Sequence, residues 1–137
     1  MEKVVAQTSQ LIHREVLRRF PEVKPRLAEG DEEYPYVVVS AVADWLGTVA
    51  KPTISPEVSS RVAAFYDWAM EQPRGASAAD DVMTIVIVGF VEDLFKRDEL
   101  LPLIPLLMTK QEMIKGRDYL RQWVGRKPYE KALNLFR

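Results

Sequence analysis

The stretch SAADDVMTIVIVGFVEDLFKR, residues 77–97, decides the fold of this chain. Apolar residues fill most positions from Val82 to Phe95, which predicts an element that is buried on most sides. A capping serine with two first-turn acids begins the stretch and two last-turn bases end it, and these signals favour a helix: Ser77, Asp80, Asp81, Lys96 and Arg97. We therefore predict a buried central helix at about residues 77–97.

The alternative for this stretch is a buried strand, because Ile85-Val86-Ile87-Val88 is rich in β-branched residues. Periodicity does not separate the two in a continuous apolar run, whereas length and end signals favour the helix. On a helical projection Asp81, Gly89, Glu92 and Lys96 share the least apolar side. We expect that side to reach solvent or an interface, and Gly89 to permit a close helix crossing.

Helical signals flank this central element. Apolar periodicity and helix caps predict helices at about residues 2–20, 34–49, 55–72, 109–124 and 127–136. Ser55 is a predicted N-cap, and Thr109 with Glu112 has the capping-box pattern. Two prolines interrupt the apolar stretch at 100–108, which predicts a short helix or an irregular buried connector. The predicted fold is all-α: residues 1–137 form a single-domain bundle of about five to seven helices around the central one.

The composition is that of a globular protein and excludes some classes of site. Of 137 residues, 47% are hydrophobic and 28% are charged, which is close to the average of folded domains. The absence of cysteine excludes disulfides, thiolate nucleophiles and thiolate metal sites. The amino terminus lacks the apolar core of a signal peptide, and no run approaches the ~20 apolar residues of a membrane span. We expect a soluble, cytoplasmic protein without a membrane partner.

The charged residues are unevenly distributed along the chain. Residues 1–28 carry six Lys/Arg against three Glu, residues 29–104 carry five against fourteen Asp/Glu, and residues 105–137 carry eight against three. Two interpretations stay open at this point. Either the basic ends fold against the acidic middle and neutralise it, or an acidic face is kept for a basic partner, whose association it would accelerate.

The sequence contains no recognisable catalytic set. His13 is the only histidine and lies beside the apolar side of the first helix, so neither a triad nor a zinc site can be built on it. The six glycines are scattered and form no phosphate-binding loop. Asp80-Asp81 and Glu92-Asp93 are better explained as dipole partners and solvated helix positions than as paired acids. We predict a non-enzymatic protein with no catalytic, metal-binding or cofactor-binding residues.

Basic residues alternate with aromatic ones near the C-terminus, as they do in some nucleic-acid-binding segments. The sequence pI of about 5.9 argues against that function, and the aromatic residues occur mainly at spacings typical of a core. The residues concerned are Lys110, Lys115, Arg117, Arg121, Arg126, Lys127 and Lys131, with Tyr119, Trp123 and Tyr129 between them.

Three short motifs resemble those of a group of small, uncharacterised bacterial helical proteins. Phe20-Pro21-Glu22 closes the first helix, Tyr36-Val37 opens the second, and residues 88–94 (VGFVEDL) end the central one. The group's pattern is Phe-Pro-Glu followed by a Gly-Phe-Leu-Glu-Asn-Leu type signature, from which this chain departs at Val91 and Asp93. The resemblance implies a helical protein similar to the immunity partners encoded beside polymorphic toxins, and it transfers no catalytic residue.

The leading hypothesis is a protein-binding module, with an immunity-type inhibitor as its specific form. Its partner would be another protein, basic in character, and would contact exposed acids of the middle region: Asp31, Glu32, Glu33, Asp44, Asp67, Glu71, Glu92 and Asp93. The alternatives are an acid- and metal-dependent enzyme, and a nucleic-acid-binding module that uses the basic C-terminal region. The sequence does not specify the oligomeric state.

Overall fold

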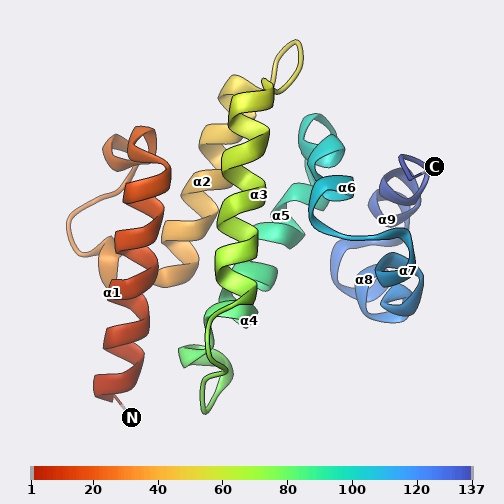
Figure 1. Ribbon diagram of the computed structural model, residues 1–137. Helices are drawn as coiled ribbons and strands as arrows, with labels where there is room; N and C mark the ends of the chain where they lie inside the picture. Colours follow the sequence, from red (N-terminus) through yellow and green to blue (C-terminus); the bar gives the residue numbers. More distant parts are fainter. Residues whose placement is uncertain (1, 137) are drawn as a thin grey trace.

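A computed structural model describes the backbone of residues 2–136 and the side chains of residues 7–136. Within these residues every regular element is helical, as predicted (Figure 1). The α-helices are α1 (Glu2–Arg19), α2 (Pro35–Val49), α3 (Pro56–Met70), α4 (Val82–Val86), α5 (Glu92–Phe95), α6 (Ile104–Leu107), α7 (Lys110–Lys115), α8 (Arg117–Val124) and α9 (Arg126–Leu133). Short 3₁₀ turns join them: η1 (Pro21–Arg26), η2 (Asp31–Glu33), η3 (Ala78–Asp80) and η5 (Asp98–Leu103).

The predicted central helix is a continuous rod with a π-helical segment, η4 (Ile87–Val91), between α4 and α5. The backbone remains helical at both junctions, Val86 and Glu92. α2 contacts α4 and η4 on one side of the rod, while α8 and α9 contact α5 on the other. Figure 1 shows α1 and α2 on the left, α6 to α9 on the right, and the rod between them, partly behind α3.

The central helix begins later than predicted. Ser77 caps only the 3₁₀ turn η3, where it forms a capping box with Asp80. The backbone is extended at Asp81, whose carboxylate accepts a hydrogen bond from the Thr84 amide at 3.2 Å and so caps α4. The sequence offers two capping residues four positions apart, Ser77 and Asp81, and the helix is capped by Asp81, which lies next to the apolar run. The helix therefore spans 82–95 rather than 77–97.

The other predicted caps are confirmed. Ser55 Oγ accepts a hydrogen bond from the Val58 amide at 3.2 Å, and the Thr109–Glu112 box closes with bonds of 2.8 and 3.1 Å. The helix predicted at 109–124 is interrupted at Gly116, a poor helix former whose backbone leaves the helical region. If α4 and α5 are counted as one helix, and α7 and α8 as another, the nine α-helices of residues 2–136 become seven, which is the upper end of the predicted range.

One hydrophobic core extends through the molecule. Phe65 of α3 packs edge-on against Phe20 and Phe90, with ring centroids 5.6 Å apart in both pairs. Such pairs add about 0.5–1.5 kcal/mol each to the effect of burial. Tyr129 of α9 belongs to the same cluster, and its hydroxyl donates to the Met113 carbonyl at 2.9 Å. The C-terminal helices thus share a core with the N-terminal ones.

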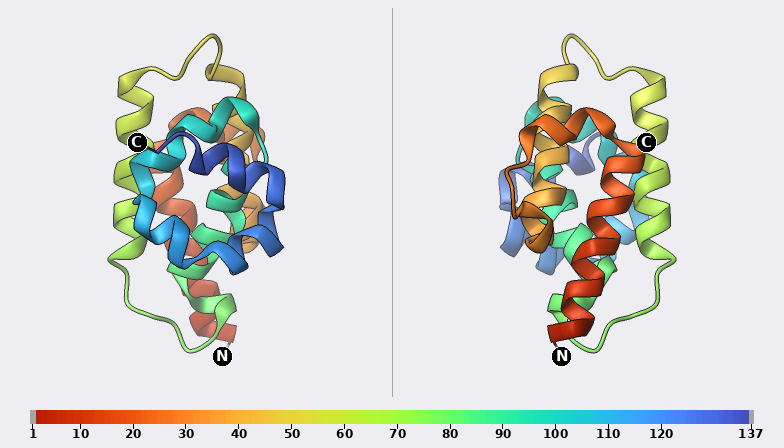
Figure 2. Two further views of the ribbon diagram at one scale, coloured as in Figure 1. Left: turned by 90° about the vertical axis from the view of Figure 1, so that its right-hand side faces the viewer. Right: turned by 90° about the vertical axis from the view of Figure 1, so that its left-hand side faces the viewer.

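The outer helices surround the rod rather than forming parallel layers. The two views of Figure 2 place α3 and α2 on opposite sides of the molecule, with the C-terminal helices nearest the viewer in the left-hand view. The proline-containing stretch at 100–108 becomes η5 and α6, with Leu100, Leu103 and Ile104 buried. Within residues 2–136, no helix is both long enough and apolar enough to span a bilayer.

Candidate functional site

The backbone of η4 lies directly against α2 at Gly89. A methyl group on Gly89 would come within 2.6 Å of Val39 Cγ2 and 3.0 Å of Tyr36 Cδ1, so only glycine fits this contact without a shift. The predicted close helix crossing is therefore confirmed. π-turns inside α-helices occur frequently at functional sites, which makes the surroundings of Gly89 the first place to examine.

Glu92 follows the π-turn and is buried, with only 5% of its surface exposed. The prediction that it lies on a solvent-facing strip was wrong, and the same holds for Asp81, which is 2% exposed. A π-turn contains more residues than an α-turn, so positions before and after it do not follow one 3.6-residue projection. In addition, Asp81 is turned inward by its role as a cap.

The Glu92 carboxylate is held by Tyr119, whose hydroxyl donates to Oε2 at 3.0 Å. Burial is the main reason why the pKa of Tyr119 rises to about 12, and the hydrogen bond to Glu92 raises it further. Tyr36 lies against the same π-turn, because its Cδ1 is 3.0 Å from the position that a methyl group on Gly89 would take. Tyr36 and Tyr119 therefore approach the π-turn from α2 and α8.

Five large side chains in α8, in the first turn of α2 or directly before it are 39–60% exposed, and we call them the aromatic face: Tyr34, Tyr36, Val37, Tyr119 and Trp123. The rings of Tyr119 and Trp123 pack against each other, with centroids 6.0 Å apart. Tyrosine and tryptophan are enriched at protein interfaces because each buries a large area at a small cost in side-chain entropy. The aromatic face thus has the composition of a binding surface.

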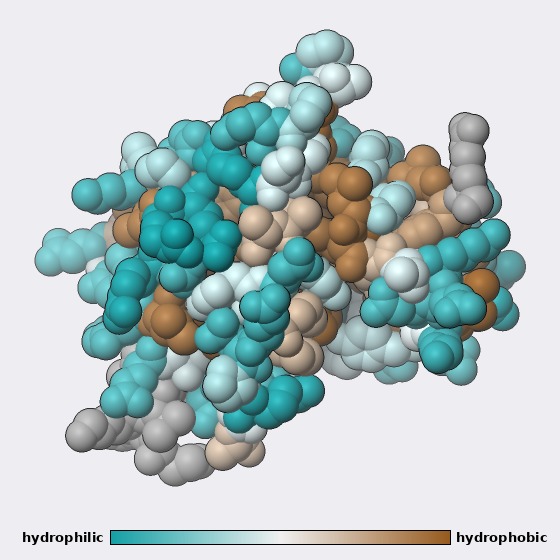
Figure 3. Space-filling model, viewed as in Figure 1, coloured by the Kyte–Doolittle hydropathy of each residue, from teal (hydrophilic) through white to brown (hydrophobic). Residues whose placement is uncertain are grey.

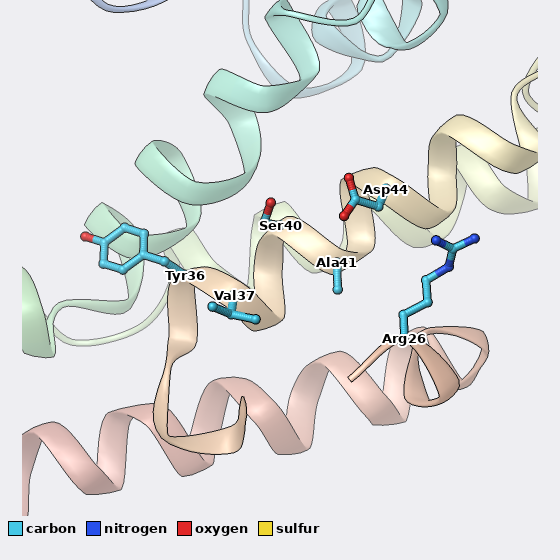
Figure 4. A pocket seen from close by; sticks show the side chains of 6 residues that line it. All are labelled: Arg26, Tyr36, Val37, Ser40, Ala41 and Asp44. Carbon is cyan, nitrogen blue, oxygen red and sulfur yellow. The ribbon is translucent and has the colours of Figure 1, made fainter. Parts of the chain in front are cut away.

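A groove of about 570 Å³ adjoins the aromatic face along α2. Tyr36, Val37, Ser40 and Asp44 line it from α2, and Arg26 lines it from the end of η1 (Figure 4). Ser40 donates a hydrogen bond to Asp93 of α5 at 3.0 Å, which places that acid beside the groove. The groove therefore combines apolar contact area with charges of both signs.

The eight acids predicted to bind a partner lie in several places. Asp31, Glu32 and Glu33 form η2, directly before the exposed Tyr34; the carboxylates of Asp31 and Glu32 accept hydrogen bonds from backbone amides at 2.7 and 3.1 Å. Asp44 and Asp93 lie at the groove, where Asp44 forms an ion pair with Arg97.

The remaining predicted acids do not join that group. Asp67 and Glu71 are exposed at the end of α3, across the molecule from α2 (Figure 2). Glu92 is buried behind Tyr119 rather than exposed. The structure therefore places Asp44 and Asp93 at the groove and the three η2 acids directly before Tyr34, and it leaves the α3 acids elsewhere.

The basic ends form few ion pairs with the acidic middle. Among the described side chains, Lys131 with Asp98 at 3.2 Å is the only pair of this kind, and both partners are largely exposed. Arg61 bridges instead to Glu22, and Arg74 and Arg97 pair with acids of the middle itself. Direct pairing with the basic ends therefore accounts for little of the negative charge in residues 29–104.

The acids that were candidates for an enzymatic site, Asp80 and Asp81, take part in helix caps. Asp81 is a helix cap that also accepts from the Gly75 amide at 2.8 Å, and Asp80 completes the capping box of η3. His13 is half-buried on α1. Residues 7–136 contain no group of three or more His, Asp or Glu side chains arranged to hold a metal ion.

Sequence patterns missed the aromatic face. Tyr119 and Trp123 are four positions apart, a spacing also typical of a buried stripe, so they were expected in the core. In α8 the buried stripe is Leu120 and Val124, one position further along. The sequence alone does not decide whether one or both of two such adjacent stripes face the core, since Phe90, Val91, Leu94 and Phe95 form two adjacent stripes that are both buried.

Comparison of the chain with protein-family models, with curated proteins and with solved structures finds no match in any of the three. The function must therefore be inferred from the aromatic face and the groove beside it. The resemblance to immunity proteins adds an expectation about the kind of partner.

Proposed function

We propose that this protein binds another protein through the aromatic face and the adjoining groove. The observation that carries the proposal is that Tyr34, Tyr36 and Val37 are all exposed at the start of α2, where Tyr36 and Val37 line the groove. Large exposed apolar side chains gathered around a concave surface are typical of protein-binding sites. The buried area of such side chains would supply most of the affinity.

The expected partner segment is basic. The three acids of η2 directly precede Tyr34, and Asp93 lies beside the groove, whereas the charge of Asp44 is already matched by Arg97. Complementary charge of this kind accelerates association and favours partners of opposite sign. An immunity-type inhibitor is the specific form we propose, in which the partner is a toxin whose activity is blocked when it binds.

Affinity capture with matched variants tests the proposal. Val37→Glu places a charge where the aromatic face lines the groove, and Ile114→Glu makes the same change at a similarly exposed position on α7 (45% and 44% exposed). We expect a protein recovered with the wild type and with Ile114→Glu to be lost with Val37→Glu. Recovery of the same proteins by all three chains, each shown to be folded, would refute the assignment of this face.

A purified partner allows the charge argument to be tested separately. Its association rate should fall as NaCl is raised from about 50 to 300 mM, while the dissociation rate changes little. Replacement of Glu32 and Glu33 by Gln should reduce that salt dependence. If the association rate is insensitive to salt, the partner is not selected by charge, although it can still bind the aromatic face.

A second candidate function is supported by one observation. Tyr119 and Trp123 are exposed on a helix that also carries Arg117 and Arg121, and Arg126 and Lys127 follow it. Exposed aromatic rings beside cations can stack on the bases of single-stranded nucleic acid. This function predicts binding of oligonucleotides that weakens steeply with salt and is lost in Trp123→Ala.

A further inference from the structure

A small cavity beneath Tyr119 combines apolar walls with a buried carboxylate. It has a volume of about 150 Å³ and lies between α3, η4 and the C-terminal helices. Ile87, Val91, Met108 and Leu120 supply apolar walls, and Glu92 and Tyr119 supply polar groups. Figure 3 shows apolar surface gathered in the recess between α3 and the C-terminal helices. A cavity of this size can accommodate a group as large as benzene.

The Glu92 carboxylate in this cavity has no cationic partner. Among the described side chains no Lys, Arg or His nitrogen pairs with it, and Tyr119 is the only hydrogen-bond donor to it. Oε1 accepts no hydrogen bond, yet it is not among the fully enclosed polar atoms without a partner, so it retains access to open space. A largely buried carboxylate without a counter-charge is unfavourable, and a bound cation would offset that effect.

The cavity is also open to the surface. Tyr119 at its edge is 42% exposed, and Tyr66, Ile87, Met108 and Gly116 are each partly exposed. Tyr119 is at the same time part of the aromatic face, so a partner bound there would lie over this opening. A side chain of the partner could therefore enter the cavity without any helix moving.

We propose that this cavity receives the side chain of a lysine from the partner protein, with its ammonium group on Glu92 Oε1 and its methylene groups against the apolar walls. This inference rests on the proposed function and names the residue that anchors the partner. Lysine fits better than arginine because Tyr119 already occupies Oε2, and a guanidinium group binds best to both oxygens of a carboxylate at once. An ammonium group needs only one oxygen.

n-Butylammonium, which reproduces the lysine side chain, tests the site without a partner. Its binding at neutral pH can be followed by NMR on the methyl groups of Ile87, Val91, Met108 and Leu120. We expect saturable shifts confined to these methyl groups, and binding by n-butanol that is weaker by about tenfold or more because it lacks the charge. Equal effects from butanol, or from NaCl at the same concentration, would overturn the proposal, and this comparison requires no variant.

Glu92→Gln should weaken butylammonium binding by about tenfold or more, because the neutral amide cannot balance the ammonium charge. Asp118→Asn is the matched control: it removes one negative charge next to Tyr119, lies on the surface and does not line the cavity. Binding should be unchanged in that variant. Unchanged binding in a folded Glu92→Gln protein, or an equal loss in both variants, would contradict the assignment to Glu92.

A third measurement separates a lysine side chain from a free amine. Nα-acetyl-lysine N-methylamide carries the same ammonium group on a backbone that cannot enter the cavity. We expect it to shift the same methyl groups as butylammonium. If only the free amine binds, the cavity is a small-molecule site and the lysine anchor is wrong. Failure of any of these amine measurements leaves the Val37→Glu capture experiment unaffected, so the two proposals can fail independently.

Discussion

Gly89 is the residue at which η4 packs directly against α2, and its replacement has a predictable effect on stability. Gly89→Ala would place a methyl group 2.6 Å from Val39 Cγ2, which is too short for any side-chain contact. Because the neighbours must shift, we predict a loss of about 1–3 kcal/mol in the free energy of unfolding, measured by denaturant titration. Gly47→Ala is the control.

At Gly47 of α2 the nearest atom to the added methyl group is the end of the flexible Arg97 side chain, 3.3 Å away. Alanine also has the higher helix propensity, by about 1 kcal/mol. Gly47→Ala should therefore be neutral or stabilising. Two glycine substitutions with the same sign and size would show that backbone entropy, and not the crossing at Gly89, determines the result.

Tyr119 provides a pH-dependent prediction at the same scale. Its pKa is about 12 in the folded chain and 10.0 without these surroundings, so the folded state binds the proton more tightly. The resulting stabilisation is complete below pH 10 and is lost as the pH rises towards 12. Unfolding of the wild type and Tyr119→Phe should be compared at pH 9 and at about pH 11.5. At the higher pH the wild type should lose free energy of unfolding relative to Tyr119→Phe. A difference that is the same at both pH values would contradict the assignment.

At the scale of single elements, Asp81 determines where the central helix starts. Its carboxylate accepts hydrogen bonds from Thr84 and from the Gly75 amide, and it pairs with Arg74. Burial raises its pKa, but these hydrogen bonds and the Arg74 charge lower it, with a net lowering. We predict that Asp81→Ala costs about 2–3 kcal/mol, because α4 loses its cap and a part-buried amide loses its acceptor.

Asp81→Asn should recover part of that loss, since asparagine is also a good N-cap. The lowered pKa means that the charged form stabilises the fold above the usual carboxyl pKa of 3.8, and that this contribution disappears as the pH falls below it. The difference in stability between Asp81→Asn and the wild type should therefore shrink between about pH 5 and pH 2. A difference that is the same at both pH values would contradict this role of the charge.

The elements show what the sequence can and cannot reveal. Local signals located Ser55, the Thr109–Glu112 box and the central apolar run, because caps and periodicity depend on neighbouring residues only. The burial of Glu92 could not be predicted, because a π-turn shifted the projection and the partner hydroxyl comes from Tyr119, 27 positions away. The aromatic face draws on α2 and α8, and only the tertiary fold brings these together.

The distribution of charge along the sequence likewise does not show which acids are free to contact a partner. The composition showed an acidic middle, but which acids are paired, buried or exposed depends on contacts between elements. Among the described side chains, Arg97 matches Asp44 and no cation matches Glu92, although both acids were predicted in the same role. The motif Phe20-Pro21-Glu22 likewise has a structural basis that was invisible in the sequence: the Arg61 guanidinium lies over the Phe20 ring and pairs with Glu22 at 2.8 Å.

At the scale of the whole molecule, the shared core predicts cooperative unfolding. Met113, Leu120 and Tyr129 belong to the same buried cluster as Phe20 and residues of the rod. A protein with Trp123 as its only tryptophan, made by Trp45→Phe and Trp68→Phe, would report on α8. Its fluorescence transition should coincide with the loss of helical circular dichroism. An earlier transition at Trp123 would show that α7 to α9 unfold separately.

The close packing of Gly89 on Val39 also has a kinetic consequence. These residues are separated by 50 positions in the chain, so their contact closes a long loop, and the entropy of that closure must be overcome before the rod is in place. Folding and unfolding rates therefore show when during folding the contact between Gly89 and Val39 forms. If the crossing forms in the transition state, Gly89→Ala slows folding; if it forms afterwards, the same substitution accelerates unfolding instead. The single methyl group that Gly89→Ala adds thus makes the order of assembly of this bundle measurable.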